Sequence, residues 1–171
     1  MQFSQFVTQF LQPLDETTKK LEQAHVLAEF FQQADSAEIP AAIYFLLGQF
    51  GPVYDNPQAN FGIEYILYSL TFFLSEQGMQ NDLFGSSESN RSETKKQLKR
   101  RYKKLGDIGL LAQQVGEDFP HTPTASSLAI NELFEQLLQL TRMSGEGSQE
   151  EKILFVEQIF RQLSPVELKY V

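Results

Sequence analysis

Cysteine is absent from this chain, and histidine occurs only twice among its 171 residues. Without cysteine there can be no disulfide, no thiolate ligand for zinc and no thiol nucleophile. His25 falls in an expected helix and His121 in a loop flanked by prolines. His25 is interpreted as a surface or half-buried helix residue and His121 as a loop residue, so we expect no metal or catalytic role for either.

Long apolar runs are also missing. The run from Ala41 to Leu47 is far shorter than the roughly 20 residues that a bilayer-spanning helix needs. No charged segment followed by an apolar stretch opens the chain, so we see no signal peptide. We therefore expect no membrane association and a cytoplasmic location.

The common short motifs of enzymes do not occur. The sequence has no GxxxxGK[ST] phosphate loop, no HExxH metal motif and no GxSxG nucleophile turn. Its carboxylates are scattered over expected helix surfaces, and none is marked as one of an acid–base pair. A small hydrolase with an unmarked site is consequently the weakest of the functions considered.

Basic residues are scarce except in one segment. The formal net charge is −8, with two lysines against eleven acids in residues 1–90 and four basic residues against ten acids in residues 105–171. Residues 91–104 hold eight of the fourteen basic side chains and one acid, Glu93. A concentrated patch decides binding more than a net sum does, and this patch favours phosphate contact.

Apolar residues recur with helical spacing nearly throughout, and no stretch alternates as a strand would. The pattern predicts an all-α, multi-helix domain with about ten helices or more and no sheet. The clearest helical segments are 3–14, 24–31, 39–50, 63–78, 91–105, 110–116, 130–138 and 153–163.

Capping signals mark two helix starts near the end of the chain. Ser164, Pro165 and Glu167 fit the N-cap, first and third positions of a capping box, and Ser148 with Glu151 fits another. The helix that begins at Pro165 breaks off at Val171 without a stop signal. We therefore expect the chain to be a fragment of a longer protein.

An internal repeat indicates two lobes. When the sequence is shifted by 129 residues, Phe30-Phe31 falls on Ile159-Phe160 and Glu38-Ile39 falls on Glu167-Leu168. Each copy comprises a long helix, a short turn and a new helix near the glutamate. The match through the turn predicts a pseudo-twofold internal repeat.

Two glycine-bearing turns begin helices, at 105–109 and 144–148. Helix N-termini present free N–H groups and a positive dipole end, which suit phosphate, and glycine lets a phosphate approach the backbone. The alternative is that these glycines only end one helix and begin the next, which is the usual role of an isolated glycine turn. On the basic helix beside the first turn, residues 96, 99, 100 and 103 are expected to share one face.

Several segments resemble the N-terminal DNA-binding domain of ATP-dependent DNA ligases of the archaeal and eukaryotic type. The most specific match is Lys104 to Ala112 (KLGDIGLLA), which is similar to the family's G-D-[LV]-G-x-[VL]-A motif. The others, in the family's order, are Phe3 to Phe6 with Leu21 to Phe31, Leu46 to Tyr54, Pro123 to Ser126, Ser144 to Lys152 and Ser164 to Tyr170. Together they cover essentially the whole of residues 1–171.

The resemblance implies non-sequence-specific binding of double-stranded or nicked DNA through phosphates and the minor groove, in replication, repair and recombination. It implies no active site here, because the Lys-x-Asp-Gly context of the ligase nucleophile is absent. ATP and Mg would serve the full-length enzyme, with an adenylation domain after residue 171 and an OB-fold domain. We expect a monomer, associated with the nucleoid if the source is prokaryotic.

The expected DNA-facing residues lie at the two glycine turns and at a third helix start. They are Lys103, Lys104, Gly106, Gly109, Thr124, Ser126, Arg142, Gly145, Gly147, Ser148 and Lys152. Lys152 is expected to be exposed. Asp107 is expected to cap its helix and not to contact DNA, because a carboxylate repels phosphate. The alternative function is a helical protein–protein interaction module that does not bind DNA.

Overall fold

The computed structural model describes residues 1–55, 57–78, 87–119, 123 and 128–171. Across these ranges the chain consists of helices and the turns between them, and the only strand-like pairing is an isolated antiparallel bridge between Gln2 and Ala129. The prediction of an all-α fold is confirmed. None of the described helices is long and apolar enough to cross a membrane.

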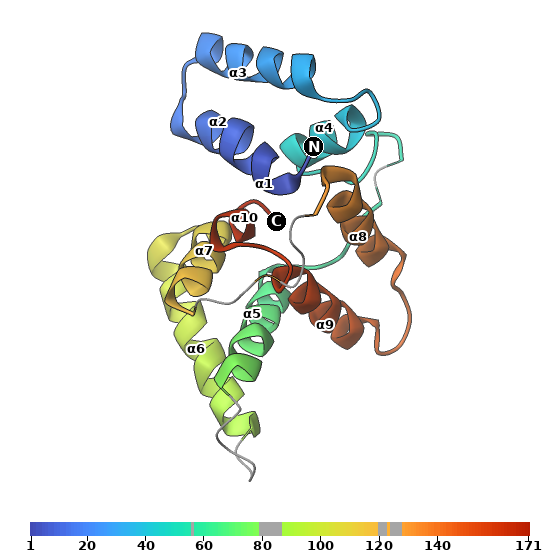
Figure 1. The fold of residues 1–171 in the computed structure, drawn as a ribbon. Helices are drawn as coiled ribbons and strands as arrows, with labels where there is room; N and C mark the ends of the chain where they lie inside the picture. The colour runs from blue at the N-terminus through green and yellow to red at the C-terminus, as the bar shows by residue number, and fades with distance from the viewer. Residues whose placement is uncertain (56, 79–86, 120–122, 124–127) are drawn as a thin grey trace. The chain divides into compact units, whose positions relative to one another are not determined.

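The chain divides into two units. Their segments can be found in Figure 1 by the colour that marks residue number. The first comprises Met1–Ala59 and Ser127–Arg142, and the second comprises Asn60–Ser126 and Met143–Val171. This division agrees with the two lobes predicted from the repeat, because each unit contains one of the two copies.

The first unit is built around an aromatic core. Its helices are α1 (Phe3–Phe6), the π-helical η1 (Val7–Leu11), α2 (Gln12–Glu16), α3 (Lys20–Gln33), α4 (Ile39–Leu47) and α8 (Ile130–Arg142). The rings of Phe6 and Phe10 lie 5.2 and 5.3 Å from the ring of Phe30, and all three side chains are buried. Tyr44 of α4 stacks on Phe134 of α8 at 5.9 Å, which joins those two helices.

The first helical stretch is not the single α-helix that the sequence predicts for residues 3–14. Its middle turn is π-helical, and the backbone N–H of Gln12 donates to the carbonyl of Val7, five residues earlier. Pro13 follows at once, and it has no N–H to donate while its ring crowds the carbonyl four residues before it. A widened turn before the proline accommodates both effects, so Pro13 accounts for the departure.

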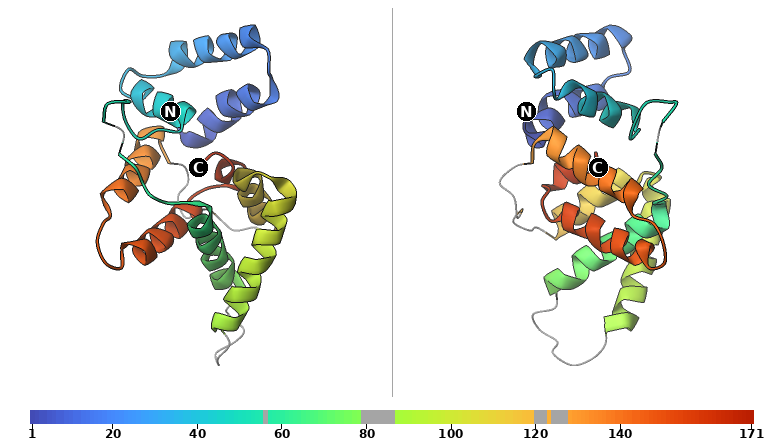
Figure 2. Two further views of the ribbon diagram at one scale, coloured as in Figure 1. Left: turned by 180° about the vertical axis from the view of Figure 1, so that it is seen from behind. Right: turned by 90° about the vertical axis from the view of Figure 1, so that its right-hand side faces the viewer.

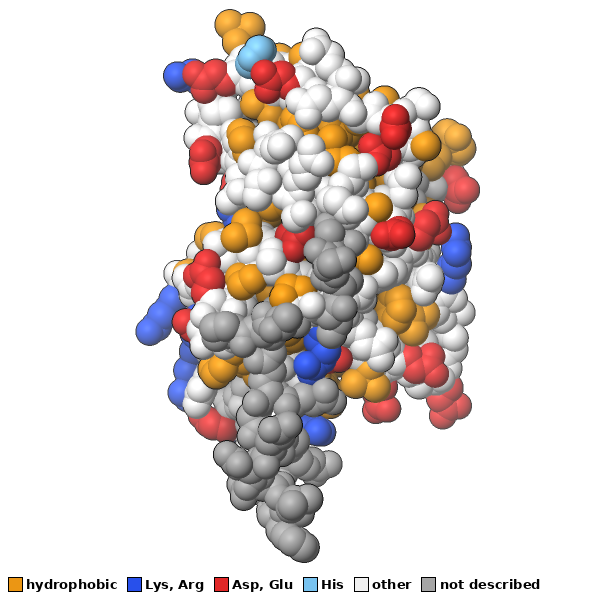
Figure 3. Space-filling model, in the orientation of Figure 1, with side chains coloured by type: hydrophobic (Ala, Val, Ile, Leu, Met, Phe, Trp, Pro, Cys, Tyr) orange, Lys and Arg blue, Asp and Glu red, His pale blue; other side chains and the backbone are white. Residues whose placement is uncertain are grey.

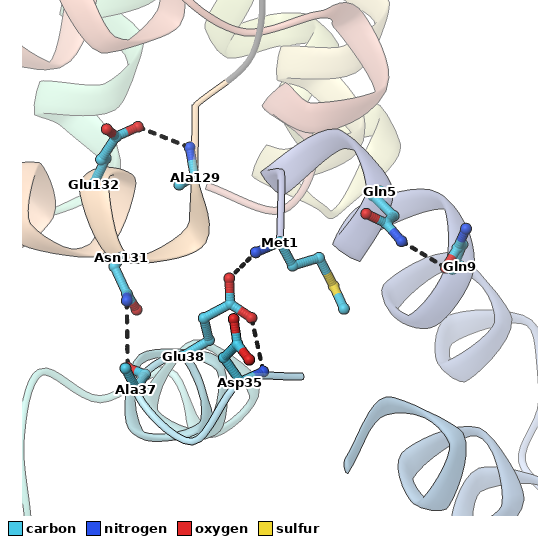
Figure 4. A network of polar contacts seen from close by, with 9 residues as sticks. All are labelled: Met1, Gln5, Gln9, Asp35, Ala37, Glu38, Ala129, Asn131 and Glu132. Atoms are coloured by element: carbon cyan, nitrogen blue, oxygen red, sulfur yellow. Dashed lines mark hydrogen bonds and ion pairs between the residues drawn. The ribbon is translucent and has the colours of Figure 1, made fainter. Parts of the chain in front are cut away.

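A polar network ties the start of the chain to α4 and α8 (Figure 4). The Glu38 carboxylate forms an ion pair with the Met1 ammonium and accepts a hydrogen bond from the backbone N–H of Asp35 at 3.1 Å. Asn131 of α8 donates to the carbonyl of Ala37 at 3.3 Å. Glu38 thus holds together segments that are distant in sequence.

The second unit contains α5 (Ile63–Gly78), α6 (Ser87–Leu105), α7 (Ile108–Asp118), α9 (Ser148–Phe160) and α10 (Pro165–Leu168). Helices α5 and α6 lie side by side in all the views of Figures 1 and 2. Helix α5 also packs on α9, where the buried Ser69 hydroxyl donates to the carbonyl of Ile153 at 2.9 Å. Helix α7 packs on α6 and on α10, which completes the unit.

Two glycines on α7 allow α10 to approach closely. A Cβ atom on Gly109 would lie 2.2 Å from the backbone oxygen of Lys169, and one on Gly116 would lie 3.1 Å from the Cα of Pro165. These glycines are seven residues apart, so they share one face of the helix. Leu168 is buried against this face and is 1% exposed.

The two repeat copies share a local hydrogen bond. In the first copy Asp35 N–H donates to Glu38 Oε2 at 3.1 Å, and in the second Ser164 N–H donates to Glu167 Oε2 at 2.7 Å. These pairs coincide under the 129-residue shift, and the predicted capping box at Ser164 is confirmed. The pseudo-twofold relation between the copies stays a prediction.

Replacing Gly109 with alanine should destabilise the protein by about 1–3 kcal/mol, because the new methyl group would overlap the Lys169 carbonyl. Urea denaturation of wild type and variant measures this difference. The matched control is Gly62→Ala, where an added Cβ would meet nothing within 4 Å. Equal losses in the two variants would contradict the proposed packing role of Gly109.

Candidate nucleic-acid interface

Three cations of α6 contact side chains of α5, and one of them, Lys99, is also exposed to solvent. Arg91, Lys95 and Lys99 recur every four residues and therefore share a face of the helix. The Arg91 guanidinium lies 4.8 Å from the ring centre of Phe72, and the Lys95 ammonium lies 3.3 Å from that of Tyr68. These contacts hold the two helices together by cation–π attraction.

Glu64 of α5 completes this set of contacts. Its carboxylate forms an ion pair with Lys99 and another with Lys95, whose Nζ lies 3.1 Å from Oε2. The hydrogen bonds from Lys99 and then from Lys95 hold the pKa of Glu64 below its ordinary value. Lys99 remains exposed, but its contact with Glu64 distinguishes it from the other residues of the predicted face.

A fourth cation of α6 is directed to α7. Arg101 Nη1 lies 2.8 Å from Asp118 Oδ2, and Nη2 donates to Gln114 Oε1 at 3.2 Å. Half of the eight basic residues in the segment therefore make contacts within the second unit. Three of these four pair with a carboxylate, whereas the ring contact of Arg91 does not neutralise its charge.

The other four cations form what we call the basic face: Lys96, Arg100, Lys103 and Lys104. All four are exposed, and none has an ion pair or hydrogen bond to another described residue. Helical geometry places them within an arc of about 100° and along about 12 Å of the axis. Figure 3 shows Lys and Arg side chains along the edge of the unit where Figure 1 places α6, with acidic side chains beside them.

The turn that follows the basic face starts α7. Gly106 ends α6 in a left-handed conformation with φ +75°, and an added Cβ there would meet nothing within 4 Å. The Asp107 carboxylate accepts a hydrogen bond from Leu110 N–H at 2.8 Å, so its predicted capping role is confirmed. Gly109 differs from Gly106, because its Cα faces the Lys169 carbonyl and packing accounts for the glycine.

The second predicted turn presents open backbone. Gly145 and Gly147 have φ values of +103° and +81°, and an added Cβ on either would meet nothing within 4 Å. Gly147 is the N-cap of α9 and Ser148 its first helical residue, with no side-chain cap hydrogen bond. The predicted capping box of Ser148 and Glu151 is therefore wrong, since left-handed Gly147 begins the helix instead.

The charges around this second turn disfavour phosphate. Lys152, predicted to be exposed, is only 6% exposed and makes contacts within the protein. Glu146, Glu150 and Glu151 are exposed at or just before the start of α9. Arg142 is exposed at the end of α8, in the first unit. The first turn thus has the stronger combination of free cations and helix N-terminus.

Two predicted residues, Thr124 and Ser126, lie outside the described residues. Lys96 and Arg100 were within the predicted basic segment but were not among the chosen contacts. Their spacing of four residues, continued by Lys103 and Lys104, is the signal that identifies them. Across the described ranges no three His, Asp or Glu side chains gather in a group that could hold a metal ion.

Comparison with known proteins places these features in a family. The family model described as "DNA ligase N terminus" matches residues 2–171. DNA ligase 1 of Methanosarcina mazei is 29% identical over 171 residues, which are 100% of this chain and 26% of that protein. The probable DNA ligase of Aquifex aeolicus is 24% identical over 96% of this chain and 25% of its own length. The DNA ligase of Pyrobaculum arsenaticum is 28% identical over 100% of this chain and 27% of its own.

Replacing Lys99 with glutamine should raise the pKa of Glu64 toward its ordinary value, because Lys99 is the main cause of the lowering. The ion pairs of Glu64 contribute fully to stability at pH values above the ordinary glutamate pKa. This contribution is lost as the pH falls through the lowered pKa of Glu64. A carbon-13 NMR titration of the Glu64 carboxyl measures the change. Lys96→Gln is the control. If the pKa of Glu64 does not rise in Lys99→Gln, Lys99 does not interact with Glu64 and belongs with the basic face.

Replacing Lys152 with glutamate should destabilise the protein by about 2 kcal/mol or more, because it reverses a buried charge. Chemical denaturation measures the loss. The same reversal at exposed Lys103 should change stability by about 0.5 kcal/mol or less. If the two variants are equally stable, burial does not determine the role of Lys152.

Proposed function

Because the chain belongs to the family of DNA ligase N-terminal domains, we propose that it binds duplex and nicked DNA without sequence preference. The basic face of α6 contacts backbone phosphates, together with the N-terminus of α7. The observation that carries this proposal is the presence of four exposed cations without partners among the described residues, the last of them four residues before the start of α7.

The chemistry of these groups suits phosphates better than bases. Exposed lysine and arginine release condensed counterions from DNA when they approach its backbone. The N-terminus of α7 adds a partial positive charge and free N–H groups. Contacts of this kind position a protein on DNA without recognising a sequence, as joining a nick at any sequence requires.

The acidity of the rest of the chain orients this binding. With a formal net charge of −8 but a cluster of cations on α6, most of the surface repels DNA. Only an approach along the basic face is favourable. The charge pattern therefore supports a defined contact surface and opposes indiscriminate adsorption.

The parent protein is proposed to be an ATP-dependent DNA ligase that acts in replication, repair and recombination. The chain spans about a quarter of the length of the relatives named above. In this proposal, adenylation and OB-fold domains of the parent bind ATP and Mg and perform the chemistry, while this domain holds the DNA. The ligase would be a monomer in the cytoplasm, at the nucleoid.

Replacing Arg100 and Lys103 together with glutamine should weaken binding to a nicked duplex about tenfold or more at low salt. The slope of log affinity against log salt should fall by about 2, one for each lost phosphate contact. Fluorescence anisotropy between about 50 and 200 mM salt, with nicked, intact and single-stranded DNA, measures both quantities.

The control is the double variant Lys19→Gln and Lys20→Gln, which removes the same charge from exposed positions of the first unit. Its binding should change less than about twofold. If both double variants lose affinity equally, only net charge matters and the basic face is not the site. Binding that ignores salt would overturn phosphate recognition altogether.

A further inference from the structure

The second unit contains a cleft that the proposed DNA contacts do not use. It has a volume of about 330 Å³ and opens between α5 and α6. Its lining residues are Tyr68, Thr71, Phe72, Arg91, Ser92 and Lys95. Two of the six are cations and none is acidic, so the cleft has a positive character.

The positive charge at this cleft exceeds the negative charge that neutralises it. Arg91 has no ion pair with a described residue, and its Nε is buried without a hydrogen-bond partner among them. Lys95 has only Glu64, which Lys99 shares. Among the described side chains, three neighbouring cations therefore share one paired carboxylate, that of Glu64. A buried N–H donor without an acceptor is costly, and an anion in the cleft would relieve that cost.

The aromatic walls hold the two lining cations in place. Lys95 lies over the ring of Tyr68 and Arg91 over the ring of Phe72, one helical turn apart on α5. Each ring attracts its cation without neutralising its charge. The cations are therefore positioned before any ligand arrives, which lowers the entropic cost of binding.

The remaining donors define the class of ligand. Ser92 and Tyr68 contribute hydroxyl groups to the lining, whereas the Thr71 hydroxyl already donates to the carbonyl of Leu67 at 2.7 Å. Arg91 and Lys95 offer several charged N–H donors, which suit a compact anion with several oxygens. The volume is at the lower end of the range for ligand sites and fits a phosphate group with a small attachment.

We propose that the cleft between α5 and α6 binds a phosphate group through Arg91 and Lys95. Such a group could belong to a small phosphorylated compound or to a DNA backbone. The inference is independent of the proposed function, because the cleft is lined by the α5-facing cations and not by the basic face.

The test follows the side-chain Nε–H of Arg91 and the amide of Ser92 by nitrogen-15 NMR in the 171-residue chain. The probes are inorganic phosphate, AMP and a nicked duplex. We expect saturable shifts at both positions. Phosphate or AMP alone producing them identifies a small-molecule site, and the duplex alone producing them identifies a backbone contact. Either result supports phosphate binding in the cleft.

The variants Arg91→Gln and Lys95→Gln should each weaken the Ser92 response about tenfold, while Arg91→Lys retains part of it. Lys20→Gln is the control, since this exposed lysine of α3 neither lines the cleft nor belongs to the basic face. Backbone NMR spectra establish that each variant is folded. No shift with any probe, or equal affinity in Arg91→Gln and wild type, would overturn the proposal. The double variant Arg100→Gln and Lys103→Gln should lose DNA binding but keep the response of Ser92 to inorganic phosphate.

Discussion

Helix α6 completes a turn every 3.6 residues, and this period divides its cations between two environments. Positions 91, 95 and 99 face α5, where aromatic rings and Glu64 hold them. The basic face, four residues at positions 96 to 104, remains exposed to solvent. One helix therefore contributes both to the packing of the second unit and to the exposed surface that we propose binds DNA. Because the helical period fixes these positions, neither group of cations could exchange faces unless α6 rotated about its axis relative to α5.

An acidic domain can bind DNA only where cations and backbone dipoles coincide, because elsewhere its charge repels phosphate. The two glycine turns illustrate this requirement. Both begin helices and both present open glycine backbone, at Gly106 and at Gly147. Lysines 103 and 104 accompany the first, whereas exposed glutamates accompany the second and Lys152 is buried. Backbone geometry alone would rank the turns equally, and the side-chain environment separates them.

The sequence was sufficient for the all-α class, most helix positions, the Asp107 cap and the Ser164 capping box, because these depend on neighbouring residues. The sequence did not predict features that depend on residues distant in the chain. Lys99 looked equivalent to Lys96 and Arg100 by spacing, and only Glu64, 35 residues away, distinguishes it. Lys152 looked exposed because burial depends on tertiary packing. The π-helical turn before Pro13 was a local effect that the periodicity did not reveal, since one extra residue in a turn barely disturbs the apolar pattern.

The two glycines of the Gly106 to Gly109 turn serve different purposes, and together they connect stability to binding. Gly106 adopts a left-handed conformation with open space beside it, so it reverses the chain between α6 and α7. Gly109 lies against the Lys169 carbonyl, so it fixes α7 against the end of α10. The start of α7 is consequently held by packing against the end of α10. In the proposed phosphate contact, the backbone groups at this N-terminus would owe their orientation to that packing.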